Sequence, residues 1–109
     1  MTREELDQAL RELLTDINID VSNGHIYYEP DQNIKIQIPA FIYSFSGINN
    51  TSADNDKLYQ CIPEYQLRWL HEDSSIDMVL KVIRRFQCAA YTNRTQNNNV
   101  TVDSFRLNV

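Results

Sequence analysis

Apolar residues recur at helical spacing near the start of the chain. The stripe consists of Leu6, Ala9, Leu10, Leu13 and Leu14, with charged and polar residues between them. Residues spaced by three and four lie on one face of a helix, so the stripe predicts a helix that packs on a core. Thr2 and Glu5 have the spacing of a capping box, which predicts that this helix begins at Arg3.

A second helical stripe lies in the later part of the chain, at Ile76, Val79, Leu80, Ile83 and Phe86. Ser74 and Asp77 have the spacing of a capping pair at its start. We expect the stripe to face the core. The charged residues of this segment are expected to lie away from it, at Asp77, Lys81, Arg84 and Arg85.

Between the two helices, apolar residues alternate with other residues, which is typical of strands. We expect a short strand over 25–29 and longer ones over 34–43 and 59–69. Pro39 cannot donate a ladder hydrogen bond, so it belongs at an edge, at a bulge or at the start of the paired region. Residues 46–56 are polar and predict a loop. Residues 39–71 therefore predict a long antiparallel hairpin with an extended tip.

Two further strands are predicted over 87–94 and 100–109, joined by a polar turn over 95–99. The order is then helix, short strand, long hairpin, helix, hairpin. Strands grouped apart from helices indicate an α+β fold. We expect a mostly antiparallel sheet with a long β-hairpin and two helices packed on it, in a single domain spanning 1–109.

Composition narrows the range of partners. The chain of 109 residues has a formal net charge of −5, which argues against binding duplex nucleic acid through surface charge. It contains no apolar run of about 20 residues, the length that crosses a bilayer, and its charged first segment is not a secretory signal. Cys61 and Cys88 are far apart, which favours two reduced thiols in a cytosolic fold.

The search for catalytic chemistry finds no motif. His25 and His71 lie without a second ligand at helical spacing, so no metal site is predicted. With only two glycines the chain has no phosphate-binding loop. Carboxylates in the run from His71 to Asp73 favour the start of the following helix. We therefore expect no catalytic residues, no cofactor and no enzymatic activity.

A row of aromatic residues along the second long strand, Tyr59, Tyr65 and Trp69, leaves a nucleic-acid alternative. Proteins that bind single strands stack bases on such rows and surround them with Lys and Arg. Here only Arg68 is close, on the opposite face of the strand. The row is better interpreted as core beneath a helix.

The order of short motifs from His25 onward resembles a known family. His-Ile-Tyr-Tyr-Glu-Pro over 25–30 is followed by Ile-Pro-Ala-Phe-Ile-Tyr over 38–43 and by a polar loop that ends in Ala-Asp-Asn-Asp-Lys-Leu-Tyr over 53–59. An Asp-Ser-Ser corner at 73–75, Phe-Gln-Cys at 86–88 and a last strand with Phe105 complete the series. The series is similar to the small tail-terminator and head–tail connector (minor capsid) proteins of tailed phages and prophages of Gram-positive bacteria.

This resemblance implies a homo-oligomeric ring, usually a hexamer, at the head–tail junction of the virion. Such a ring caps the tail tube and meets a head-completion or connector protein, after assembly in the host cytoplasm. DNA would pass through its lumen without specific binding, which suits an acidic chain. No membrane is involved. The alternative is a small phage-encoded inhibitor that binds a host protein through its acidic surface.

A ring requires two different complementary surfaces on each subunit. We expect one of them on the hairpin arm, formed by Tyr43, Phe45, Asp54, Asn55, Asp56, Lys57 and Tyr59. Arg84 and Arg85, on the outer face of the second helix, are a second candidate for an intersubunit contact.

Overall fold

The computed structural model describes residues 2–22, 24–52, 59–73, 75–86 and 89–108, with the backbone alone for 49–52 and 59–61. Its elements follow in the order α1 (Arg3–Asp16), β1 (Ile26–Tyr28), β2 (Ala40–Ser52), β3 (Tyr59–His71), α2 (Asp77–Arg85), β4 (Ala89–Asn97) and β5 (Val100–Asn108). The five strands form one sheet in the order β1-β2-β3-β5-β4. Only the β1–β2 pair is parallel among these strands. The α+β prediction is therefore confirmed.

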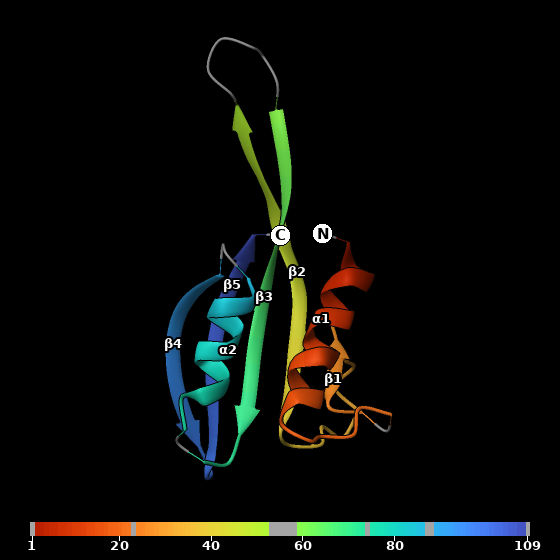
Figure 1. Cartoon of the computed structure of the whole chain (residues 1–109), viewed down its shortest axis with the longest axis vertical. Helices are drawn as coiled ribbons and strands as arrows, with labels where there is room; N and C mark the ends of the chain where they lie inside the picture. The colour runs from red at the N-terminus through yellow and green to blue at the C-terminus, as the bar shows by residue number, and fades with distance from the viewer. Residues whose placement is uncertain (1, 23, 53–58, 74, 87–88, 109) are drawn as a thin grey trace.

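Both helices lie on the same face of the sheet, as Figure 1 shows. There α1 lies over β1 and β2, whereas α2 lies over the half formed by β3, β5 and β4. The body and the long hairpin together measure 50 × 27 × 24 Å.

Helix α1 forms as its sequence predicts. The backbone N–H of Glu5 donates to Oγ1 of Thr2 at 3.1 Å, and the backbone N–H of Thr2 donates to Oε1 of Glu5 at 3.3 Å. This capping box satisfies two amide groups that the first turn leaves without partners. All five residues of the predicted stripe are buried. The chain turns away after the helix at Asn18, which has a positive φ of 64° and a side chain suited to that conformation.

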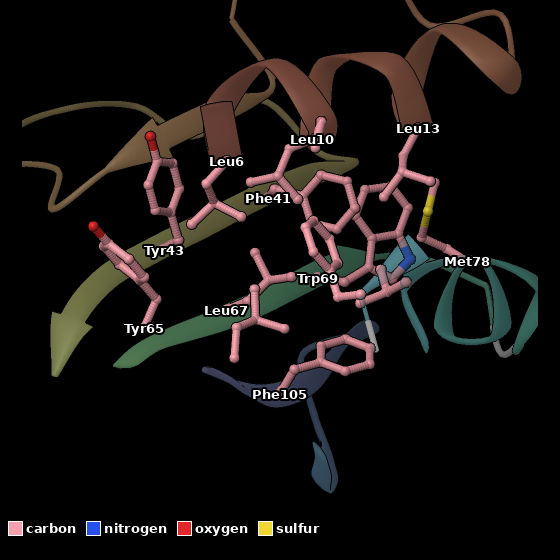
Figure 2. Close-up of a cluster of buried hydrophobic side chains, with 14 of the residues drawn as sticks. Leu6, Leu10, Leu13, Phe41, Tyr43, Tyr65, Leu67, Trp69, Met78 and Phe105 are labelled. Atoms are coloured by element: carbon pink, nitrogen blue, oxygen red, sulfur yellow. The ribbon is translucent and has the colours of Figure 1, made fainter. Parts of the chain in front are cut away.

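The core lies between the two helices and the sheet (Figure 2). Leu6 and Leu10 of α1 meet Phe41 of β2, all fully buried. The ring of Phe41 also lies 4.7 Å from that of Trp69 on β3. Each such side chain contributes about 1.5–3 kcal/mol when it is fully removed from water. The aromatic row of β3 belongs to this core, since Tyr65 and Trp69 are only 6% and 4% exposed.

The orientation of α2 differs from the prediction. Val79 and Phe86 of the predicted stripe are buried, together with Met78 and Val82, whereas Ile76, Leu80 and Ile83 are exposed. Two apolar stripes overlap on this short helix. It packs beside β4 and buries the stripe that contains Met78 and Val82, rather than the one that contains Leu80 and Ile83. Ile76 occupies the N-cap without a side-chain bond, and the backbone N–H of Asp77 donates to Oγ of Ser75 at 3.1 Å. Ser74 lies outside the described residues.

The hairpin strands also differ in extent from the prediction. Strand β2 begins at Ala40, directly after Pro39, so residues 34–39 are not part of a strand. Pro39 lacks the amide hydrogen that would extend the ladder. Residues 46–52 of the expected loop belong to β2 instead, and β3 begins at Tyr59. The rest of that segment, 53–56, lies outside the described residues. Likewise β4 continues to Asn97, and the turn to β5 is made by Asn98 and Asn99, both with positive φ, as a type I′ turn requires.

Candidate functional site

The long hairpin extends beyond the rest of the sheet (Figure 1). Strands β2 and β3 pair along their whole length, from Ala40 with Leu70 to Ser52 with Tyr59. On its other side β3 pairs with β5 only as far as Glu64 opposite Asn108. Among the described residues, 48–52 and 59–63 therefore pair only with each other. We call this two-stranded extension the arm.

A β-bulge marks the point where the arm leaves the body. The register shifts between Phe45 and Gly47, which leaves Ser46 without a partner in the ladder. The hydroxyl of Ser46 donates to the backbone oxygen of Glu64 at 3.1 Å and to its Oε2 at 3.0 Å. Nε of Arg106 lies 3.5 Å from Oε1 of Glu64. A bulge increases local twist and redirects a strand, so these contacts set the direction of the arm.

The base of the arm exposes an apolar patch beside α1. Tyr28 is 36% exposed, Phe45 is 44% exposed and Ile48 is 57% exposed. Tyr28 pairs with Tyr43 in the ladder, and their rings lie 4.9 Å apart. Phe45 follows two residues later, with its ring 5.9 Å from that of Tyr65. We call Tyr28, Phe45 and Ile48 the arm-base patch.

The expected arm residues have different positions. Phe45 is exposed at the base of the arm, as an interface residue must be. Tyr43 is only 1% exposed, and Figure 2 shows it beside Tyr65 at one end of the core cluster. It therefore belongs to the core rather than to the surface of the arm. Asp54, Asn55, Asp56 and Lys57 lie outside the described residues, as does the side chain of Tyr59.

Helix α2 presents the second candidate surface. Arg84 is exposed on its last turn. Arg85 is partly engaged within the chain, because its Nη2 lies 3.9 Å from Oε2 of Glu12 on α1. The structure adds an apolar stripe that the sequence did not assign to the surface: Ile76, Leu80 and Ile83 lie on one side of the helix at exposures of 54%, 39% and 41%. We call these three residues the α2 stripe.

A buried polar network joins the end of β3 to the β4–β5 hairpin. Asp103 is fully buried and accepts from Nε of Arg94 at 2.7 Å and from the hydroxyl of Tyr91 at 2.7 Å. Its second oxygen accepts from Nη2 of Arg94 at 3.1 Å and lies 2.7 Å from Nε2 of His71. On its other side, Nδ1 of His71 lies 2.9 Å from Oδ1 of Asp73.

These contacts shift the pKa values of the two carboxyl groups. Burial alone would raise the pKa of Asp103, but hydrogen bonds from Arg94, Tyr91 and His71 lower it below its ordinary value. The hydrogen bond with His71 also lowers the pKa of the exposed Asp73, helped by the backbone N–H of Ser75. Both groups are thus held as carboxylates.

An open pocket of about 540 Å³ lies beside this network, between Trp69, Met78 and the connection from β3 to α2. Its polar side includes His71, Asp73 and Ser75. Both ring nitrogens of His71 already face carboxylate oxygens, so neither is free to accept a proton from a serine, as a catalytic base would. The network is arranged to fix the corner between β3 and α2.

The sequence contains one signal for this network that was missed. Thr101, Asp103, Phe105 and Leu107 alternate along β5 and are all buried. A carboxylate within such an apolar alternation requires partners, and Tyr91 and Arg94 on the neighbouring strand supply them. Alternation alone does not indicate that His71 joins from β3.

The described residues contain neither a group of side chains that could hold a metal ion nor a helix that could cross a bilayer. Among the residues with described positions, no three His, Cys, Asp or Glu side chains lie close enough together to hold a metal ion. Within the same residues, neither helix is long and apolar enough to cross a bilayer.

Comparisons with known proteins do not add a relative. No protein-family model matches the sequence, and no curated protein matches it significantly.

Proposed function

We propose that this chain is a structural virion protein that forms a ring at a phage head–tail junction, where it terminates the tail tube and joins the tail to the head. The observation that carries the proposal is the arm, a two-stranded extension of the core sheet that the body does not cover. The order of motifs from His25 to Phe105 supports the same family. The chain acts in this role without catalysis or a cofactor.

Ring subunits need one surface that reaches out and another that receives it. The arm-base patch and the α2 stripe supply two separate exposed apolar surfaces on one chain. Monomeric soluble proteins rarely expose several large apolar side chains together unless they bind a partner. The partners in this proposal are further copies of the chain, the tail tube protein and the connector on the head, with DNA passing through the lumen.

The experiment is assembly of tail tubes from the tube protein of the same phage or prophage, with and without this chain. Negative-stain images are expected to show a ring at one end of each tube, and the tubes should stop growing once they carry it. Tubes that lengthen at the same rate with the chain present, and carry no ring at either end, contradict the proposal.

A further inference from the structure

Helix α2 is apolar on two sides, and the fold covers only one of them. Met78, Val79 and Val82 are buried against the body. The α2 stripe on its outer side is spaced at i, i+4 and i+7, so its three side chains form one continuous ridge. A helix that is apolar around most of its circumference is usually covered on all of those sides. The outer ridge therefore calls for a partner.

The arm-base patch is a second uncovered surface, and α2 of the same chain does not cover it. In Figure 1 α2 lies over the β3–β5–β4 half of the sheet, whereas the arm leaves the body beside the start of α1. Tyr28, Phe45 and Ile48 remain 36% to 57% exposed there. Two apolar surfaces that cannot meet within one subunit can meet between two subunits.

Charge indicates that the two surfaces fit each other. Helix α2 carries Lys81, Arg84 and Arg85 against a single carboxylate, Asp77, although the chain as a whole has a net charge of −5. Beside the arm-base patch lie exposed carboxylates. Glu4 lies in the first turn of α1, and Oε1 of Glu29 accepts from the backbone N–H of Phe45 at 3.3 Å. Arg3 lies among them, with its guanidinium 5.0 Å from the ring centroid of Tyr28 and 3.4 Å from Oε1 of Glu4. The net positive charge of α2 and the net negative charge beside the arm-base patch favour their association.

We propose that the α2 stripe of one subunit docks on the arm-base patch of a second copy of this chain. The inference rests on the proposed ring and specifies which surfaces form it. In the proposed ring the contact is heterologous, so each subunit uses its patch toward one neighbour and its stripe toward the other. Such contacts close into a ring or continue as a filament, whereas a twofold dimer would form the same contact twice between two subunits and stop there.

The test is disulfide cross-linking between single-cysteine chains, made in a background with Cys61→Ser and Cys88→Ser. One chain carries Ile48→Cys and the other carries Leu80→Cys. The matched control replaces Ile48→Cys by Ile34→Cys, because Ile34 is 46% exposed and belongs to neither surface. Circular dichroism establishes that each chain is folded.

Mixing the Ile48→Cys and Leu80→Cys chains is expected to form disulfide dimers at least about tenfold faster than the control mixture, because docking raises the local thiol concentration. A chain that carries both substitutions should give a ladder that extends beyond dimers. Equal rates in the two mixtures, or a double variant that stops at dimers, overturn the proposal.

A second measurement covers the case in which the cysteine-free background does not fold. A photo-cross-linking amino acid at position 80 of the chain with its native cysteines should react with residues near Ile48 of another copy. A cross-link to α2 of another copy, or no cross-link between copies at all, also overturns the docking. If the chain caps tail tubes but these cross-links fail, the ring uses other surfaces. If the cross-links form but tubes are not capped, the proposed function is wrong and the docking stands.

Discussion

Nε2 of His71 lies 2.7 Å from Oδ2 of Asp103, although the two residues are 32 positions apart in the chain. The contact joins the end of β3 to the middle of β5, and the ring of His71 stacks on Trp69 at 5.7 Å. Arg94 binds the same carboxylate with two nitrogens and also donates to the backbone oxygen of Ser75 at 3.2 Å. The carboxylate of Asp103 on β5 thus connects β3 and β4, and Arg94 extends this connection to the segment before α2.

Replacing that group should weaken the fold strongly. We expect Asp103→Asn to lower the free energy of unfolding by about 2–3 kcal/mol, because Arg94 would lose its charged partner. This expected loss of stability is smaller than for a fully buried ion pair, since the side chain of Arg94 is 26% exposed. Urea unfolding followed by circular dichroism measures it. Asp73→Asn is the control, because the side chain of Asp73 is 76% exposed, and a loss as large as that of Asp103→Asn would contradict the account.

Stability should also depend on pH through Asp103. Its pKa is lower in the folded chain than in the unfolded chain. The unfolded chain therefore binds the proton more readily, and this contribution to stability is fully present above a pH of about 4. It is lost as the pH falls through the lowered pKa of the folded state. Urea midpoints measured from pH 6 to pH 2 should fall more steeply for the native chain than for Asp103→Asn. Parallel curves for the two chains would show that Asp103 does not supply this pH-dependent contribution to stability.

The orientation of α2 can be tested with two identical substitutions. Leu10→Ala removes a fully buried side chain and should cost about 2–5 kcal/mol. Leu80→Ala removes a side chain that is 39% exposed and should cost less than about 1 kcal/mol in the isolated chain. Thermal or urea unfolding measures both. A cost for Leu80→Ala that matches Leu10→Ala would place the α2 stripe in the core instead.

The parts of the fold that local pattern determines were predictable from the sequence. Helix α1 has a capping box and a single leucine stripe, so only one face of it can be buried. The hairpin of β2 and β3 was predicted from two alternating segments, although β2 begins at Ala40 rather than Ile34 and continues to Ser52, into the expected loop. Helix α2 has two overlapping stripes, and the choice between them depends on the shape of the sheet beneath it. No pattern in one short segment contains that information.

The candidate surfaces were predictable only in part for the same reason. Phe45 is exposed as expected, whereas Tyr43, two residues earlier, lies under α1. Strand alternation places both residues on one side of the sheet. The position of α1 then determines which of them is buried, and strand alternation does not predict that position. The network around Asp103 joins three strands, so it depends on pairing between segments that are distant in the chain.

The role of the arm is the central claim, and the length distribution of tail tubes tests it most directly. Tubes would be assembled with the native chain, with a chain lacking residues 49–55, and with a chain in which a Gly-Ser segment of equal length replaces 49–55. The native chain should give short tubes, each with a ring at one end. Both altered chains, folded by circular dichroism, should leave tubes uncapped and longer. Tubes of native length, capped by rings of the shortened chain, would contradict the claim.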